Sequence, residues 1–474
     1  MHKHITSFVE SLEQNEKLRN TVTNPEDFYQ SELQLYESLR LLSSLSTEVQ
    51  CHSHLLDFLR ASLQPSLFSL FTHPNSDVSI LALQTTLDFI TTEAEGDHHG
   101  SQFAIDVDHL NPMLVESLVS IDVQNIENMK SFSLIVSIIT RLSQLSINYS
   151  TFYFTNSKFK IFVTEYITNR KYLRDHLYDD FSVNLFELLA FYSEQFNEGL
   201  DIFDPFLPAF VSCLEIRVET SMKLLQFECT EHLVNILSIL VLNDRFNTTQ
   251  KQRLTRAIIS AIDGMSSIWS CCFRLLTFCL TDEDFVRYFY EVDGIPSLEL
   301  LLNKRRSRSS MVLRYSDPFA TSELEVVQIL IPFDSHLFGV LRDLVLISSG
   351  KFAEKLSSMV VDGQYYLDFV NIYVDYCLRL AQKVKHGSEL DKIVISELEE
   401  IVDYLSVLIA HVIVIGAATD EDVCNQILSL LQSSNISLDH IITSLAELIE
   451  TEENRKVKDR IVAQKTILEK INSV

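Results

Sequence analysis

The sequence predicts an all-α protein whose helices stack into an α-solenoid, and three observations predict this fold class. Ten glycines and nine prolines are few for 474 residues, whereas sheets and barrels with many tight turns need more of both. Hydrophobic residues make up 46% of the chain, and they recur at three- and four-residue spacing, which indicates helices that bury one stripe. Alternating patterns that would indicate strands do not occur, and so much apolar surface also excludes a largely disordered chain.

The individual helices follow from this spacing, taken in chain order. It is clearest over residues 78–90, 129–145, 181–196, 222–242, 337–347, 365–384, 398–415 and 436–449. Polar or proline-containing segments separate the helical patterns, because such residues end helices or favour turns. These breaks are Asn24-Pro25, His73-Pro74-Asn75, the segment 93–100, Asn111-Pro112, Asp204-Pro205, Asn243-Asp244, Asp293-Gly294, Asp317-Pro318 and Gly387-Ser388. The acidic stretch 93–109 as a whole is expected to form a loop.

Long apolar helices begin at a regular interval. They start near Ser76, Asn125, Asp179, Thr220 and Gly264, about 40 to 50 residues apart, which is the repeat length of armadillo and HEAT arrays. We therefore expect an armadillo-like repeat domain over residues 25–450. Residues 1–24 would form an N-terminal helix or extension, and residues 451–474 a charged C-terminal helix or cap.

The charge of the chain limits its partners. A net charge of −27 disfavours direct binding to phosphate backbones and attracts basic peptides, although acidity can also serve solubility alone. The most apolar stretch, residues 407–418, is about half the length that spans a bilayer and contains His411, so we expect no membrane segment. None of the eight cysteines forms a Cys-x-x-Cys pair, which suits a reducing compartment, the nucleus or cytoplasm.

Motifs for chemistry are missing from the sequence. It has no G-x-G-x-x-G, no phosphate-binding loop, no H-E-x-x-H and no G-x-S-x-G. Cys51-His52-Ser53-His54 offers metal ligands, but adjacent helical residues point in different directions, and His98-His99 fits a solvated loop. Cys271-Cys272 fits a core position. We expect no catalytic residue, no cofactor and no metal, and hence no enzyme.

One acidic region is a candidate binding surface. Between Asp179 and Glu231 there are eleven acidic residues and two basic ones. Helical spacing places Asn184, Glu187, Phe191 and Glu194 on one face, and Glu228, His232 and Asn235 on one face of the next long helix. In such a groove, asparagine holds a peptide backbone, carboxylates pair with Lys or Arg, and aromatic rings pack on their stems. The alternative is a solvated outer face.

The only dense basic run is a serine-rich turn. It contains Lys304, Arg305, Arg306 and Arg308, and fits a localisation signal, a regulatory phosphorylation region or an intramolecular partner for the acidic surface. An ordinary solvated turn explains the same residues.

Three collinear segments resemble one family. The segment S-E-L-Q-L at 31–35 precedes L-F-S-L-F-T-H-P-N-S-D-V-S-I at 67–80, which ends a short helix, turns, and starts another. Residues 284–302 then lead into Lys304 and the S-R-S-S turn at 307–310, and residues 427–442 resemble a final helical pair. In this order, over roughly residues 25–450, the chain resembles the β-catenin-like protein 1 family of armadillo proteins. We expect the family's longer charged N-terminal extension to be short or absent here, and the stretch 148–256 matches mainly in helix pattern.

The resemblance implies a non-enzymatic nuclear scaffold of pre-mRNA splicing. It would engage the nineteen complex of the spliceosome and a Myb-domain splicing factor, bound through a basic segment that is similar to a localisation signal. The family also self-associates, which implies that a homodimer can form. A second hypothesis is a nuclear-import adaptor of the karyopherin-α type. That class reads basic signals with repeated Trp-x-x-x-Asn arrays, whereas this chain has one tryptophan, Trp269.

Overall fold

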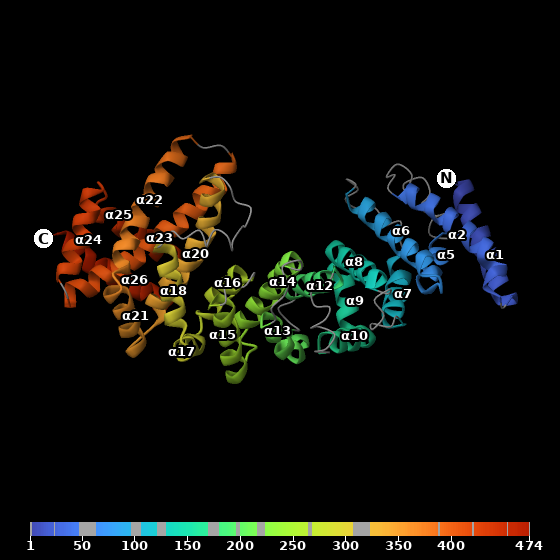
Figure 1. Ribbon diagram of the computed structural model, residues 1–474, viewed down its shortest axis with the longest axis horizontal. Helices are drawn as coiled ribbons and strands as arrows, with labels where there is room; N and C mark the ends of the chain where they lie inside the picture. Colours follow the sequence, from blue (N-terminus) through green and yellow to red (C-terminus); the bar gives the residue numbers. More distant parts are fainter. Residues whose placement is uncertain are drawn as a thin grey trace. The chain divides into compact units, whose positions relative to one another are not determined.

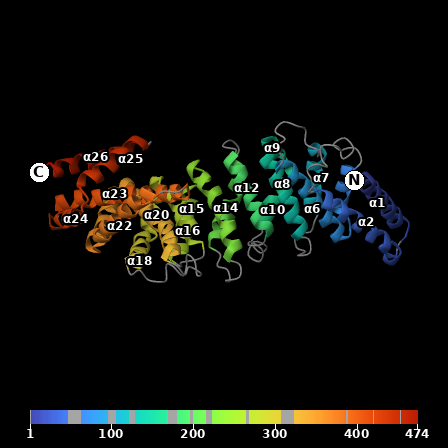
Figure 2. The same cartoon turned by 90° about the horizontal axis from the view of Figure 1, so that it is seen from above.

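The computed structural model is built of helices throughout the part of the chain that it describes (Figures 1 and 2). The described residues are 2–22, 24–46, 63–95, 106–120, 129–168, 180–195, 200–215, 223–263, 268–306, 323–386, 389–419, 421–452 and 454–473, and they include no strand. They fall into two compact units. Unit 1 comprises Met1–Ala209 and Leu224–Ile236, and unit 2 comprises Phe210–Lys223 and Leu237–Val474.

Unit 1 is a double layer of short and medium helices. Its elements are α1 (His2–Thr21), α2 (Pro25–Ser46), α5 (Gln64–Ser69), η2 (Leu70–Thr72), α6 (Ser76–Glu95), α7 (Val107–Ser120), α8 (Met129–Leu145), α9 (Ile147–Thr155), α10 (Ser157–Thr168), α12 (Asp180–Gln195) and η4 (Leu200–Phe206). The next two, α13 (Leu207–Leu214) and α14 (Lys223–Leu242), each contribute to both units.

Helices α2, α6, α8 and α12 pack side by side, each against the next, as one layer of unit 1. A second layer, of η2, α7, α9 and α10, covers one side of it; η2 packs on both α6 and α7, and α7 on α8. The opposite sides of α6, α8 and α12 therefore face the same way. Burial follows the sequence pattern, because Phe132, Ile135, Ile139 and Leu142 of α8 are fully buried at helical spacing.

The residues that carry the family resemblance meet in one hydrogen-bonded network. Asn15 Nδ2 of α1 donates to Ser31 Oγ of α2 at 2.9 Å, and His73 Nε2 lies 3.3 Å from Asn15 Oδ1. Asn75 Nδ2 donates to Glu32 Oε2 at 3.1 Å. The S-E-L segment and the H-P-N turn, some 40 residues apart in sequence, thus hold α1, α2 and the start of α6 together. Asn15 and Ser31 are buried, so losing either partner would leave a polar group unpaired.

Unit 2 contains α15 (Thr248–Asp263), α16 (Trp269–Cys279), α17 (Glu283–Glu291), α18 (Gly294–Arg306), α20 (Glu323–Ile347), α21 (Lys351–Asp362), α22 (Tyr365–His386), α23 (Glu389–Thr419), α24 (Glu421–Ser433), α25 (Leu438–Thr451) and α26 (Arg455–Asn472). Helices α16, α20, α23 and α25 form a row in which each packs on the next, and α22 and α24 pack on α23. The last helix, α26, contacts α20, α23 and α25 (Figure 2).

The predicted helices are confirmed with small changes in their ends. All eight helical patterns coincide with α6, α8, α12, α14, α20, α22, α23 and α25, and the five long repeat helices begin at Ser76, Met129, Asp180, Lys223 and Trp269. Two of the predicted breaks are turns in which an aspartate adopts the left-handed conformation, Asp244 with φ 50° and Asp293 with φ 61°. Asp317-Pro318, Gly387-Ser388, Cys51 to His54 and His98-His99 lie outside the described residues.

The prediction of a break at Asn111-Pro112 was wrong. Both residues lie inside α7, where proline removes one backbone hydrogen bond. Tertiary packing outweighs this loss, because Leu110, Leu114 and Leu118 are fully buried and the exposed Pro112 is on the outer side. The buried Asn111 side chain also accepts a 2.5 Å hydrogen bond from Tyr153 Oη of α9.

The prediction of a loop over 93–109 was wrong at both of its described ends, since α6 extends to Glu95 and α7 starts at Val107.

Two helices contain apolar stretches that are longer than residues 407–418, the most apolar stretch identified in the sequence. Leu224–Leu242 of α14 and Ile395–Ala418 of α23 are long and apolar enough to cross a bilayer, judged by length and composition only. The core helices of soluble proteins pass the same test, and more than half of each stretch is buried inside the protein. Such buried helices are weak indications of a membrane span.

Candidate functional site: a polar face on unit 1

The predicted acidic face of α12 exists as a partly exposed strip. Asn184, Glu187 and Phe191 are half-buried and Glu194 is exposed. The opposite side of α12 is core, because Leu185, Leu188 and Leu189 are fully buried. A helix of this pattern presents its polar strip on the side that the neighbouring helices leave open.

The structure gives Asn184 a specific role within the fold. Its Nδ2 donates to Ser133 Oγ at 2.8 Å and to Ser137 Oγ at 2.9 Å, both on α8. The amide group therefore ties α12 to α8, and its Oδ1 is the part that can accept a hydrogen bond from a bound segment. Ser133 and Ser137 were not among the predicted site residues, although their four-residue spacing on one helix was the available signal.

A cation on α8 lies next to this strip. Arg141 follows Ser137 by one helical turn and is half-buried. Its Nη1 donates to Gln144 Oε1 at 3.3 Å, whereas its buried Nε has no hydrogen-bond partner among the described residues. A buried N–H group without an acceptor lowers stability locally, and because it is enclosed by the protein it does not contact a segment bound at the surface.

Helix α6 adds a carboxyl group to the same layer. Gln84 Nε2 donates to Asp88 Oδ1 at 2.8 Å, and both side chains are half-buried. Burial raises the pKa of Asp88, and the hydrogen bond from Gln84 offsets part of that rise. A cationic partner would stabilise the charged form of this carboxyl group.

The second predicted strip lies on α14. Glu228, His232 and Asn235 are half-buried, as is Glu231. This part of α14 belongs to unit 1, the same compact unit as α12. We define the unit 1 polar face as the open sides of α6, α8 and α12 together with this strip of α14. It offers carboxylates, amides and hydroxyl groups, and Phe191 as a half-exposed aromatic ring.

The basic run has a different environment from the turn that was expected. Lys304, Arg305 and Arg306 form the last turn of α18, and Arg308 lies outside the described residues. Arg305 Nε donates to Asp334 Oδ1 at 2.7 Å and Nη2 donates to Oδ2 at 2.8 Å. Asp334, on α20, is fully buried and also accepts a 2.7 Å hydrogen bond from Tyr376 Oη of α22. Arg305 is thus a packing residue of unit 2.

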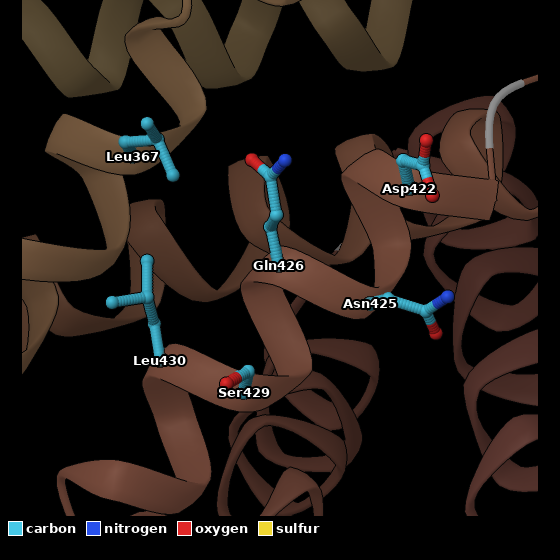
Figure 3. A pocket seen from close by; sticks show the side chains of 6 residues that line it. All are labelled: Leu367, Asp422, Asn425, Gln426, Ser429 and Leu430. Carbon is cyan, nitrogen blue, oxygen red and sulfur yellow. The ribbon is translucent and has the colours of Figure 1, made fainter.

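Unit 2 also has an open pocket of about 460 Å³ between α22 and α24. Figure 3 shows its lining, which is Leu367, Asp422, Asn425, Gln426, Ser429 and Leu430. Gln426 Oε1 accepts a 2.9 Å hydrogen bond from Tyr366 Oη. With one carboxylate and neutral polar groups, the pocket can bind through hydrogen bonds and offers no acid–base pair. Among the described residues, no three His, Cys, Asp or Glu side chains gather as metal ligands.

The fold defines a class: the described helices pack as those of an armadillo-type α-solenoid do. Residues 1–209 match the family described as "Catenin-beta-like, Arm-motif containing nuclear". This match covers less than half of the chain and supports the resemblance of the motifs to a β-catenin-like family, whose description is that of nuclear proteins. A comparison with curated proteins found no match.

Solved helical-repeat proteins are similar at low identity. A structure from work on the interaction between cadherin and β-catenin has 11% identity, with 98% of this chain and 100% of that chain covered and a TM-score of 0.39. Importin β has 12% identity, 98% and 57% coverage and a TM-score of 0.41. A mutant of Kap121p has 13% identity, 95% and 46% coverage and a TM-score of 0.40. The chain spans about half the length of the latter two.

Proposed function

We propose that this protein is a non-enzymatic, spliceosome-associated scaffold whose unit 1 polar face binds basic segments of splicing factors. The partners would include the nineteen complex and a Myb-domain splicing factor, which are implied by the family resemblance. The observation that carries the proposal is the position of Glu187, Glu194 and Glu228. These three carboxylates lie on partly exposed sides of α12 and α14 in one compact unit, where they can pair with Lys or Arg side chains.

The neighbouring groups support recognition of an extended segment. Asn184 Oδ1 can accept a hydrogen bond from a backbone N–H. Phe191 is half-exposed and can pack against the alkyl stem of a bound lysine. The acidic chain as a whole would speed the approach of a basic partner, since long-range attraction raises association rates.

The test is charge reversal on the polar face. Each reversal at a half-exposed site is worth on the order of 1 kcal/mol, so Glu187→Lys, Glu194→Lys and Glu228→Lys together should weaken binding of a Lys/Arg-rich peptide by about 100-fold or more. Fluorescence anisotropy with a labelled peptide measures this loss, and wild-type affinity should fall steeply with added salt.

A matched control separates the site from general acidity. Glu13, Glu299 and Glu354 are exposed and lie on other helices, and their reversal changes the net charge by the same amount. We expect this control to bind the peptide within about threefold of the wild type, because distant exposed charges are screened. Equal loss in both triple variants would refute the polar face and leave only a general effect of charge.

Partner identification decides between the two function classes. Affinity purification from nuclear extract should recover splicing factors with the wild type and lose them with the triple variant. Recovery of importins and their cargo without splicing factors would instead support an import adaptor of the karyopherin-α type. Self-association stays a prediction, which light scattering on the purified protein measures directly.

A further inference from the structure

The C-terminal helix α26 lies across three helices of the unit 2 row, α20, α23 and α25. On α23, Glu400, Tyr404, Val407 and His411 share one face by their spacing. Glu400 is exposed and Tyr404 half-buried at the beginning of this face, whereas Val407 is fully buried and His411 lies against Gln464 of α26. The first half of this face packs on α20, where Glu400 Oε2 accepts a 3.2 Å hydrogen bond from Ser335 Oγ and the Tyr404 ring lies under Arg342. Helix α26 covers its second half.

The contact residues of α26 form a narrow stripe. Val457, Ile461, Gln464 and Leu468 are buried at spacings of four, three and four, and the exposed side carries most of its charge. Arg460 Nη1 adds a 2.7 Å hydrogen bond to the carbonyl oxygen of Ser348, just after the end of α20. Helix α26 is therefore an amphipathic helix that packs on the outside of the row through one apolar stripe, as a bound helical ligand would.

The charge of α26 contrasts with that of the rest of the chain. Six of its residues are Lys or Arg (Arg455, Lys456, Lys458, Arg460, Lys465 and Lys470), and its only acidic residues are Asp459 and Glu469. Lys456 Nζ forms an ion pair with Glu283 of α17, and both side chains are largely open to water. Such a pair holds a helix weakly.

Several carboxyl groups lie close together on the unit 2 row. Burial raises the pKa of Asp403 on α23 to about 6, together with the negative charges of Glu447 on α25 and of Glu399. Arg342 and Ser444 lower this pKa in part. Burial raises the pKa of Asp343, Arg342 offsets part of this rise, and Glu452 at the end of α25 adds to it. On the surface that α26 itself meets, Lys456 and Arg460 both lower the pKa of Glu283 on α17, so a basic helix is the partner whose charge fits there.

The contact between α26 and α23, which we call the seat of α26, contains two buried polar atoms without a partner among the described residues. His411 Nδ1 and Gln464 Nε2 are 3.4 Å apart, but His411 Nε2 and Gln464 Oε1 are both buried and have no hydrogen-bond partner among the described residues. Burial and the nearby Arg460 lower the pKa of His411 to about 4, so the ring is neutral at physiological pH. Two unpaired buried polar atoms weaken the seat relative to an apolar contact of the same shape.

From this geometry we propose that α26 is a displaceable helix that masks a docking face on α20 and α23. The occupant that replaces it is a basic amphipathic helix of a partner protein, with apolar residues at the spacing of Val457, Ile461 and Leu468. The face lies in unit 2 and uses none of the residues of the unit 1 polar face. A negative result for the α26 proposal would therefore not count against the proposed function, and a negative result for the proposed function would not count against α26.

The experiment uses a labelled synthetic peptide of residues 455–472 and three forms of the full chain. Deletion of residues 455–474 opens the face, and the double variant Ile461→Ser and Leu468→Ser weakens the seat without shortening the chain. The double variant His411→Leu and Gln464→Leu removes both unpaired atoms and should tighten the seat. Circular dichroism and Trp269 fluorescence confirm that each form is folded.

We expect the peptide to bind the opened and weakened forms at least tenfold more tightly than the wild type, and the tightened form at least threefold more weakly. A peptide with serine at the positions of Ile461 and Leu468 should not bind. Hydrogen exchange should show faster exchange of α26 than of α23 in the wild type, because a displaceable helix opens without global unfolding.

Two results would overturn the proposal. One is a folded opened form that does not bind the peptide, or binds it no better than the wild type does. The other is a dimer in light scattering that α26 deletion abolishes, because then the face receives the helix of a second copy. If the deleted form does not fold, the serine double variant and the exchange measurement decide.

Discussion

Removing the carboxylate of Asp334 should destabilise unit 2 more than any comparable change to a surface ion pair. Asp334 is fully buried and accepts hydrogen bonds from Arg305 Nε at 2.7 Å and from Tyr376 Oη at 2.7 Å. Burial alone would lower the pKa of Arg305, but the Asp334 carboxylate outweighs it and the net shift is upward. Asp334→Ala leaves this guanidinium, whose side chain is only 16% exposed, without its counter-charge.

The expected loss follows from the burial of both partners. Breaking a buried ion pair by removing one member costs about 3–5 kcal/mol. At an m value of about 3 kcal/mol/M in urea, the midpoint of unfolding falls by roughly 1 M or more. The single tryptophan, Trp269, is the first residue of α16 in unit 2, so its fluorescence follows the unfolding of that unit.

Two controls define the result. Asp375→Ala breaks an exposed pair on α22, in which Arg379 Nε and Asp375 Oδ2 are 2.8 Å apart and the side chains are 40% and 53% exposed, and it should cost under about 0.5 kcal/mol. Arg305→Met with Asp334→Leu removes both charges and should recover most of the loss. A midpoint for Asp334→Ala within about 0.2 M of the wild type would refute the reasoning.

Two further predictions concern single polar contacts. Asn184→Ala removes the hydrogen bonds to Ser133 and Ser137 and should lower the stability of unit 1 by about 1–2 kcal/mol, visible as faster hydrogen exchange in α8 and α12; unchanged exchange would contradict the packing role. Asp282 has a lowered pKa: burial raises it, but Lys251 Nζ at 2.6 Å and the backbone N–H of Asp284 at 2.7 Å outweigh burial. Its stabilisation is present above the ordinary pKa of 3.8 and is lost as pH falls through the lower folded value. Asp282→Asn should therefore flatten the acid-unfolding curve followed by Trp269, and an unchanged curve would contradict the assignment.

The positions of the helices were predictable because they depend on local pattern. The stripe of Phe132, Ile135 and Ile139 repeats at the helical period, and that period alone identifies α8 with its ends at Met129 and Leu145. Pro112 shows the limit of such local rules. A proline in a helix is unfavourable by itself, and only the burial of Leu110 and Leu114 against neighbouring helices makes α7 continue through it.

The candidate site was predictable only in part. Helical spacing placed Glu187 and Glu194 on one side of α12, but it could not indicate that the Asn184 amide binds serines of α8, because those residues lie about 50 positions earlier in the sequence. For the same reason the basic run gave no sign that Arg305 is paired with Asp334. Contacts between helices depend on which faces pack, and a single sequence does not specify that directly.

The sequence by itself determined the helical fold class, the repeat spacing, the acidic charge and the family resemblance, since each follows from local period, composition or motif. The tertiary structure decided how these parts are used. It brought Ser31, Glu32, His73 and Asn75 together across two helices and a turn. In the structure Arg305 pairs with the buried Asp334 and is not a free surface cation, and the basic helix α26 packs on α23. Such outcomes arise from burial and pairing between distant segments, which have free energies that no local pattern contains.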